Sequence, residues 1–370
     1  NCTSIVNING SWNIGGLIGN NQFGTVQNCT TASNVSGDNY IGGLIGSSSG
    51  TIQNCSSIGN VKGEENVAGL VGFNSGTVQK CSATGNVSGN LSVGGLIGNN
   101  QFGSLYDCYT IGNISGIRNV GGLVGQLNLS YNFPWKSFNS FYCINYTTVN
   151  NKHYVTPYGI YKNQFEDWIS NGKSLDIDDY LSKIPGTNNY NISSVSDMKK
   201  MLPFASFPYY KFKQTSDINL ASETEFYIPI LKSEYNGNGH SISHLEITYY
   251  NNDNLGMFGT IYVGGSVVNV SIINSQVSGN DLIGGLSGYN QGVILNCSTA
   301  GNTIGIDSVG GLVGFNSATI QNCYATGDMS GGWYVGGLVG FNRDKVNNSY
   351  ATGEVIGDYE VGGLVGLSDS

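Results

Sequence analysis

The 370-residue chain contains little charge, and basic residues are especially few. Lys and Arg total 15 against 24 Asp and Glu, and the net charge is −9. Because nucleic acids are bound mainly through Lys and Arg that neutralise phosphates, we expect no nucleic-acid partner. A polybasic membrane-binding surface is disfavoured on the same ground. The chain also lacks an apolar run of about 18 residues, so we expect no insertion into a membrane.

Signals for catalysis or cofactor binding are scarce as well. The helical H-E-x-x-H motif of zinc proteases, paired Cys-x-x-Cys motifs and phosphate-binding loops do not occur. On one strand, His240, His244 and Glu246 would share a face and could bind a metal, although alternation of polar residues explains them better. Residues 176–179 resemble a calcium-binding loop only loosely, because its glycine and its closing glutamate are missing. We therefore expect no enzyme activity, no cofactor and no metal site.

What the chain does contain is glycine, with 56 residues, and apolar residues, which make up 39%. Its 23 tyrosines and many β-branched residues favour a packed β protein. The phrase "GGLVG", or a near copy of it, occurs nine times, and within two runs its leucine recurs every 26 or 27 residues. These leucines are Leu17, Leu44, Leu70, Leu96, Leu123, Leu286, Leu312, Leu338 and Leu364.

A second residue of the repeat lies at a constant distance from the motif leucine. A cysteine lies 15 residues before the leucine in seven copies, and Ser349 takes this place before Leu364. After Cys2 at the start of the chain, the cysteines at this position are Cys29, Cys55, Cys81, Cys108, Cys297 and Cys323.

A repeat of this length predicts one coil of a parallel β-helix. A propeller blade would need about 40–45 residues, and no helical periodicity is present. We therefore predict an all-β fold, a β-solenoid with about 26 residues per coil. Coils stack about 4.8 Å apart, so equivalent residues form ladders. The leucine ladder would lie in the core, and the glycines would keep the lumen narrow or permit tight corners.

This pattern resembles the GLUG-motif repeat family, whose core reads G-L-any-G. The resemblance is close over residues 1–125 and 282–366, and segments such as "YNGNGHSISHLEI" extend it over 195–281. The family occurs in large bacterial and archaeal surface proteins, including adhesin-like proteins. The resemblance therefore implies a β-helical, repetitive scaffold that is extracellular or located on the cell surface.

The repeats divide the chain into three parts. Residues 1–125 are expected to form a solenoid of five coils, and residues 195–370 a second one, with lead-in coils at 195–281 and GLUG coils at 282–370. Between them, 126–194 would hold a degenerate coil, carrying Cys143 after an eight-residue insertion, and an irregular, partly helical connector. Helix-like spacing begins near Phe165, and Ser196 would cap a short helix within 191–202.

The cysteines allow two interpretations. Serine replaces cysteine at one copy of the ladder position, and stacked side chains would run parallel, which favours a buried ladder of free thiols. In a secreted protein, however, eight cysteines could instead form four disulfides. The alternative pairs are Cys2–Cys29, Cys55–Cys81, Cys108–Cys143 and Cys297–Cys323.

The chain is also rich in N-x-S/T sequons. Those in N-C-S/T are expected to point into corners and to hydrogen-bond along an asparagine ladder. Those in or beside the S-G turns are the better candidates for glycosylation: Asn34, Asn86, Asn90 and Asn113.

A non-catalytic extracellular structural protein is the function that these features favour. The chain begins at "NCT" and stops after "GGLVGLSDS", inside a repeat, and an uncapped solenoid exposes a strand edge that is prone to pairing. We therefore expect head-to-tail self-association into a filament or fibre, or else a stretch of a longer polypeptide. A carbohydrate- or host-binding adhesin is the alternative, and a polysaccharide-cleaving enzyme is disfavoured because no carboxylate cluster repeats. Tyrosines that could stack on sugars are Tyr40, Tyr289, Tyr324, Tyr334, Tyr350 and Tyr359.

Overall fold

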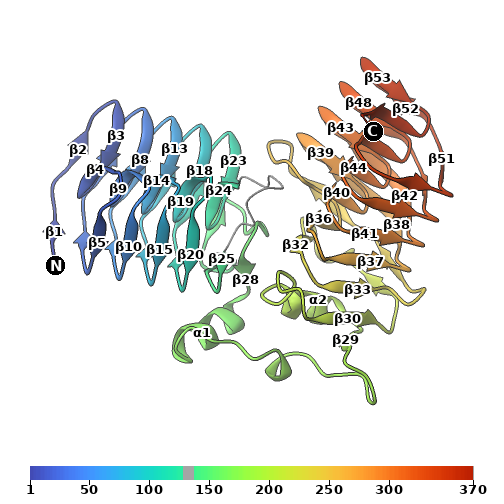
Figure 1. Ribbon diagram of the computed structural model, residues 1–370, viewed down its shortest axis with the longest axis horizontal. Coiled ribbons are helices and arrows are strands. Elements are labelled where there is room, and N and C mark those ends of the chain that lie inside the picture. Colours follow the sequence, from blue (N-terminus) through green and yellow to red (C-terminus); the bar gives the residue numbers. More distant parts are fainter. Residues whose placement is uncertain (128–136, 370) are drawn as a thin grey trace. The chain divides into compact units, whose positions relative to one another are not determined.

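The protein is an all-β solenoid, as its repeats predict. The computed structural model describes residues 1–127 and 137–369, with strands in 49% of the chain and helices in 5%. The parallel sheets form about 14 turns of about 26 residues each (Figure 1). The chain divides into two compact units, Asn1–Leu175 and Asp176–Ser370, and the boundary falls inside the predicted connector.

The first unit contains five parallel sheets, and each coil contributes one strand to each sheet in turn. One sheet contains β1 (Thr3–Ser4), β6 (Thr30–Thr31), β11 (Ser56–Ser57), β16 (Ser82–Ala83), β21 (Tyr109–Thr110), β26 (Phe141–Cys143) and β28 (Gly159–Ile160). The next contains β2 (Ile8–Asn9), β7 (Val35–Ser36), β12 (Val61–Lys62), β17 (Val87–Ser88), β22 (Asn113–Ser115) and β27 (Thr148–Val149). The third contains β3 (Trp12–Gly15), β8 (Asn39–Gly42), β13 (Glu65–Ala68), β18 (Leu91–Gly94) and β23 (Arg118–Gly121). The fourth contains β4 (Ile18–Asn21), β9 (Ile45–Ser48), β14 (Val71–Asn74), β19 (Ile97–Asn100) and β24 (Val124–Leu127). The fifth contains β5 (Thr25–Gln27), β10 (Thr51–Gln53), β15 (Thr77–Gln79), β20 (Ser104–Tyr106) and β25 (Ser137–Phe138).

The second unit repeats this plan with four sheets. One contains β29 (Tyr190–Ile192), β30 (Lys211–Gln214), β33 (Glu234–Asn236), β37 (Ser266–Val268), β41 (Val293–Leu295), β45 (Thr319–Gln321) and β50 (Val346–Asn347). The largest contains β31 (Ile218–Asn219), β34 (Ser241–Ser243), β35 (Glu246–Thr248), β38 (Ser271–Ser278), β42 (Ser298–Ile304), β46 (Tyr324–Thr326), β47 (Met329–Ser330), β51 (Tyr350–Thr352) and β52 (Val355–Ile356). The third contains β32 (Ile228–Leu231), β36 (Phe258–Ile261), β40 (Ser287–Asn290), β44 (Val313–Asn316), β49 (Val339–Asn342) and β54 (Val365–Ser368). The fourth contains β39 (Asp281–Gly284), β43 (Asp307–Gly310), β48 (Trp333–Gly336) and β53 (Tyr359–Gly362).

Equivalent residues of successive coils face one another, as the repeat spacing predicts. Val61 pairs with Val35 on one side and with Val87 on the other, and Val87 pairs with Ile114. The strands are short because the chain turns at fixed positions. The residue before each ladder cysteine has a positive φ, for example 56° at Asn28 and 53° at Asn54. Asparagine tolerates this left-handed conformation better than most residues, which explains why it recurs at this corner.

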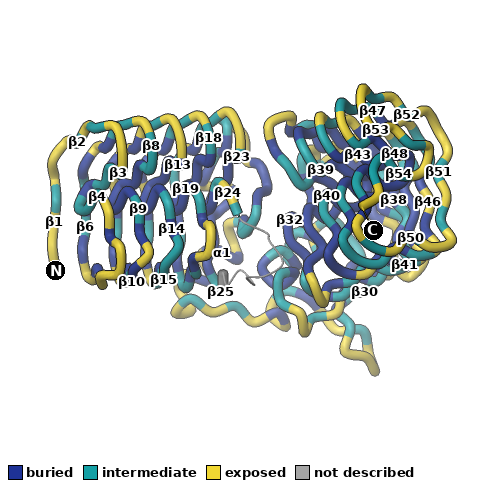
Figure 2. Tube along the Cα trace, turned by 45° about the horizontal axis from the view of Figure 1, so that its top comes forward, coloured by how far each residue is buried: buried dark blue, intermediate teal, exposed yellow. Residues whose placement is uncertain are grey.

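The motif leucines lie where a core ladder requires them. Seven of them have no exposed surface: Leu44, Leu70, Leu96, Leu123, Leu286, Leu312 and Leu338. Leu17 is half-buried, and Leu364, on the outermost described coil, is 38% exposed. Burying one such side chain contributes roughly 1.5–3 kcal/mol. Figure 2 shows buried residues lining the inside of each unit and exposed residues along its corners.

The second glycine of the motif allows adjacent coils to approach closely. A Cβ atom on Gly43 would lie 2.1 Å from the carbonyl oxygen of Gly69, and one on Gly95 would lie 2.2 Å from that of Gly122. Any larger residue would force the coils apart at this point. Contact between coils, rather than a special backbone angle, is therefore the reason for this glycine.

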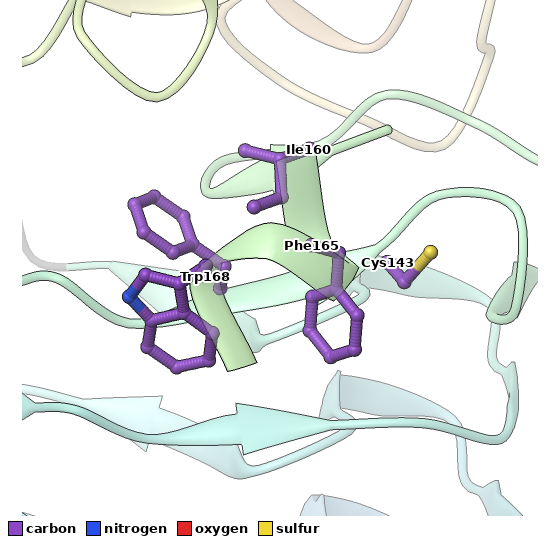
Figure 3. Packing of buried hydrophobic residues seen from close by; sticks show 5 residues of the cluster. Cys143, Ile160, Phe165 and Trp168 are labelled. Carbon is purple, nitrogen blue, oxygen red and sulfur yellow. The ribbon is translucent and has the colours of Figure 1, made fainter. Parts of the chain in front are cut away.

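A helical cap packs against the first unit. Helix α1 (Lys162–Ser170) buries Phe165 and Trp168 against Phe141, Cys143 and Ile160 (Figure 3). The predicted helical spacing ends there, since a single 3-10 turn, Ile177–Asp179, follows. In the second unit, helix α2 (Val195–Met201) is capped by Ser194, whose Oγ accepts the N–H of Asp197 at 3.2 Å. The prediction of Ser196 as the N-cap was wrong, because the helix begins two residues earlier.

The degenerate coil places a serine, and not Cys143, at the ladder position. Phe138 pairs with Tyr106, and the backbone N–H of Cys108 donates to Ser140 Oγ at 3.1 Å. Cys143 lies three residues further on, where it pairs with Ile160 and joins the α1 cluster. The assignment of Cys143 to the ladder was therefore wrong, and the expected eight-residue insertion falls on residues outside the described ones.

Candidate functional site

The ladder cysteines form a continuous chain of hydrogen bonds along the axis of each unit. The backbone N–H of Cys29 donates to Cys55 Sγ, that of Cys55 to Cys81 Sγ, and that of Cys81 to Cys108 Sγ, each at 3.4 Å. Cys297 and Cys323 repeat the contact at 3.4 Å in the second unit. Each thiol also donates to the carbonyl oxygen two residues before it, as Cys81 does to Gln79 at 3.1 Å. The thiols therefore satisfy backbone groups that would otherwise be buried without partners.

This environment raises the pKa of three ladder thiols, whereas the hydrogen bond with Cys297 lowers the pKa of Cys323. The hydrogen bond with Cys81 and burial raise the pKa of Cys55, and the hydrogen bond with Cys108 raises the pKa of Cys81. Burial raises the pKa of Cys297 as well. A thiol in this state is a poor nucleophile and a poor metal ligand, because both roles require the thiolate. All eight cysteines are free thiols in the structure, and all but Cys2 are buried.

A second, buried ladder consists of asparagines that lie four residues after the motif leucine. Asn74 Nδ2 donates to Asn100 Oδ1 at 2.7 Å, and Asn290 and Asn316 repeat the bond at 2.8 Å. These four side chains have no exposed surface. Sequence analysis missed this ladder, although an Asn at a constant distance from the leucine signals it in most copies.

A groove of about 650 Å³ runs across successive coils of the first unit, along β2, β7, β12, β17 and β22. Its floor includes buried valines, and one residue of each coil forms a row of exposed asparagines along it. The row contains Asn34, Asn60, Asn86 and Asn113. Three of the predicted glycosylation sites thus lie side by side on one surface, while Asn90 is exposed at the following corner.

A second hollow of the first unit, of about 510 Å³, combines aromatic and amide side chains. Tyr40 and Phe73 make an edge-to-face contact with ring centroids 5.4 Å apart. Gln126 Oε1 accepts hydrogen bonds from Ser92 at 2.7 Å and from Asn99 at 3.3 Å. The remaining lining residues are Glu65, Asn66, Gln101 and Leu127.

The tyrosines proposed to stack on sugars lie on different surfaces and contact other aromatic rings. Tyr324 and Tyr350 stack with ring planes 5° apart, and Tyr359 stacks on Trp333 with centroids 4.1 Å apart. Tyr289 contacts Phe315, and Tyr334 contacts Phe341. Each pair joins consecutive coils or strands, so these rings stabilise the stacking of the solenoid.

The candidate metal ligands do not come together. His244 has a φ of 58° and separates β34 from β35, so the expected single strand face does not exist. His240 lies 3.5 Å from Asp217, and Asp178 binds Tyr190 and Lys183. Asp176 caps the 3-10 turn by accepting the N–H of Asp178 at 3.0 Å. Within residues 1–127 and 137–369, no three His, Cys, Asp or Glu side chains are arranged to hold a metal ion.

No helix in the described part of the chain combines the length and the apolar character needed to span a membrane.

The repeats are similar to a known family profile and to part of one known protein. The profile described as "The GLUG motif" matches residues 63–88, 307–330 and 331–356. Halomucin from Haloquadratum walsbyi (strain DSM 16790 / HBSQ001) is 30% identical over 132 residues. That match covers 31% of this chain but only 1% of halomucin. No solved structure matches the chain. The GLUG profile falls on coils of both units, and the protein is therefore a β-solenoid that carries GLUG repeats, as its sequence predicts.

Proposed function

We propose that the chain is a non-catalytic structural segment of an extracellular surface protein, built to extend by stacking one coil on the next. The single observation that carries this proposal is the stacking of the motif leucines in register from coil to coil in each unit, accompanied over several coils by cysteine and asparagine ladders. Such ladders give every coil the same contact surface. The GLUG profile and the similarity to part of halomucin support a location at the cell surface.

On the outermost described coil of the second unit, no other described residue covers this contact surface. Val361 is 44% and Leu364 is 38% exposed, although their equivalents in inner coils are buried. A Cβ atom on Gly363 would meet nothing within 4 Å, whereas the equivalent atom on Gly337 would lie 2.2 Å from the carbonyl oxygen of Gly363. A further GLUG coil, supplied by a second copy of the chain, fits this surface, because strand edges pair readily with strands of the same kind.

Electron microscopy of the purified chain tests this proposal. We expect rods that lengthen by whole multiples of one chain as the protein concentration rises. Single chains at every concentration would count against stacking between copies, and would leave a longer polypeptide as the source of the covering coil.

An adhesin that binds carbohydrate is the alternative, and the Tyr40–Phe73 hollow is the observation that favours it. Aromatic faces and amide groups together are suited to sugar rings and hydroxyls. A glycan array probed with the chain and with the variants Tyr40→Ala and Phe73→Ala would test this function. We expect binding that is lost in the variants, and an array without signal for the unaltered chain would contradict it.

A further inference from the structure

Two rows of exposed or partly exposed asparagines run along the solenoid surface, and both contain sequons. The groove row, defined above, consists of Asn34, Asn60, Asn86 and Asn113. The corner row consists of five of the asparagines that precede ladder cysteines or their equivalents: Asn28, Asn54, Asn269, Asn296 and Asn322. The two rows differ in which atom of the side-chain amide is engaged.

In the groove row, the side-chain oxygen is engaged. Asn34 Oδ1 accepts the backbone N–H of Asn60 at 3.0 Å, Asn60 Oδ1 that of Asn86 at 3.0 Å, and Asn86 Oδ1 that of Asn113 at 3.1 Å. Because a backbone N–H can only donate, the oxygen must be the atom that faces it. No residue within 1–127 or 137–369 accepts a hydrogen bond from Nδ2 of these asparagines, whose side chains line the groove.

The second unit supports the view that this position needs only an oxygen. There Asn302 Oδ1 accepts the N–H of Asp328 at 3.1 Å, and Asp328 Oδ1 accepts the N–H of Glu354 at 2.9 Å. A carboxylate therefore performs the structural task without an amide nitrogen. The nitrogens of Asn34, Asn86 and Asn113 are surplus to the fold.

In the corner row, every asparagine except Asn28, which begins the row, donates a hydrogen bond through its side-chain nitrogen. Asn54 Nδ2 donates to Asn28 Oδ1 at 3.2 Å, Asn296 Nδ2 to Asn269 Oδ1 at 3.1 Å, and Asn322 Nδ2 to Asn296 Oδ1 at 3.1 Å. Whichever way each amide is oriented, a ladder of this kind uses one nitrogen per contact. A bulky group on Nδ2 would disrupt these bonds.

We infer that the groove row is a set of N-glycan attachment sites and that the corner row is not used, although both carry sequons. The groove sequons are completed by Ser36, Ser88 and Ser115. In the transfer, Nδ2 attacks C1 of a sugar that bears a phosphate or pyrophosphate leaving group. The Nδ2–C1 bond forms, the C1–O bond breaks with its electron pair leaving on the phosphate oxygen, and Nδ2 loses one proton. The oxygen ladder remains intact throughout, because only the surplus nitrogen reacts.

The test uses the full chain, secreted from a eukaryotic host and fused to an unstructured tag that carries its own sequon. Only molecules with an occupied tag are scored. Enzymatic glycan release in ¹⁸O-water converts each occupied Asn to labelled Asp, which peptide mass mapping locates. We expect label at Asn34, Asn86 and Asn113, and little or none at Asn54 and Asn296, whose Nδ2 atoms donate hydrogen bonds.

Two matched variants create one new sequon in each row. Lys62→Thr completes a sequon at Asn60 in the groove row, and Tyr324→Thr completes one at Asn322 in the corner row. We expect a new glycan at Asn60 and none at Asn322. An unlabelled groove row on molecules with an occupied tag, or equal labelling of the two rows, would overturn the inference. Because the unaltered chain already contains sequons of both rows, the test stands even if a variant fails to fold.

Discussion

The backbone N–H of Cys55 donates to the Sγ atom of Cys81 in the next coil, 3.4 Å away. This contact makes the thiol a structural acceptor and not a reactive group. At the end of each ladder a serine oxygen replaces the sulfur, since Cys108 donates to Ser140 and Cys323 donates to Ser349, both at 3.1 Å. In these coils the position is therefore occupied by a small side chain that both accepts and donates a hydrogen bond.

The first prediction concerns the replacement of one ladder thiol. We expect Cys81→Ala to lower the free energy of unfolding by about 1–3 kcal/mol, because the buried N–H of Cys55 loses its acceptor. Cys81→Ser, which keeps an acceptor, should cost clearly less. Urea unfolding of the two variants measures this difference. Equal losses of unfolding free energy in the two variants would mean that the size of the sulfur atom, and not its hydrogen bond, accounts for the stabilisation.

The second prediction is that the fold loses stability at alkaline pH. In the unfolded chain a thiol ionises at a pKa of about 8.5, whereas the folded state raises the pKa of Cys55, Cys81 and Cys297 and lowers that of Cys323 alone, so the raised values outnumber the opposing one. The folded state therefore binds more protons above that pH, so the stabilising contribution is complete below about pH 8.5 and is lost as the pH rises further. Unfolding measured from pH 7 to 10.5 should show this decline.

The double variant Cys55→Ser, Cys81→Ser is the control for that series. Its decline should be shallower, because two of the titrating groups are removed while tyrosines and lysines are unchanged. A decline as steep as that of the unaltered chain would show that other groups cause it.

The third prediction separates free thiols from the disulfide alternative. We expect all eight cysteines to react with an alkylating reagent when the protein is denatured without a reductant. Intact-mass measurement counts the modified residues. If no cysteine reacts until reductant is added, the ladder is cross-linked and the hydrogen bonds described for it do not hold.

The fourth prediction concerns the buried asparagine ladder. Asn316 accepts from Asn290 and donates to Asn342, at 2.8 Å in both cases. We expect Asn316→Ala to cost about 1–3 kcal/mol for each buried polar group left without a partner. Asn316→Ser should be milder, because Ser48 occupies this position naturally and accepts from Asn21 at 3.2 Å. Thermal unfolding of both variants tests whether Asn316→Ala is destabilised more than Asn316→Ser.

The features that could be predicted from the sequence are those in which the same residue type recurs at a constant spacing. The motif leucines and cysteines recur every 26 or 27 residues, so their stacking followed directly from the coil length. Cys143 was assigned wrongly because its residue type suggested the ladder, whereas the pairing of β25 with β20 gives that place to Ser140. The cap of α2 was misplaced by two residues, since "SSVSD" offers several serines of the same kind.

The two asparagine rows show a different limit of sequence analysis. Asn34 and Asn54 both stand in sequons and are both exposed, yet one uses its side-chain oxygen and the other its side-chain nitrogen. This difference depends on the direction in which each side chain leaves its corner, and no sequence pattern records it.

The central claim is that one coil stacks on the next at the surface around Gly363. In inner coils, a Cβ atom on the equivalent Gly95 would lie 2.2 Å from the carbonyl of the following coil, whereas on Gly363 it would meet nothing. Gly95→Ala should therefore lower the free energy of unfolding by about 1–3 kcal/mol through overpacking, and Gly363→Ala should leave the stability of the single chain unchanged.

Sedimentation of the unaltered chain and of Gly363→Ala, compared over a range of concentrations, tests the claim most directly. We expect concentration-dependent association of the unaltered chain and its loss in Gly363→Ala, because the added methyl group would meet the carbonyl of an incoming coil. Association that is equally strong in the variant, or absent from both proteins, would contradict it.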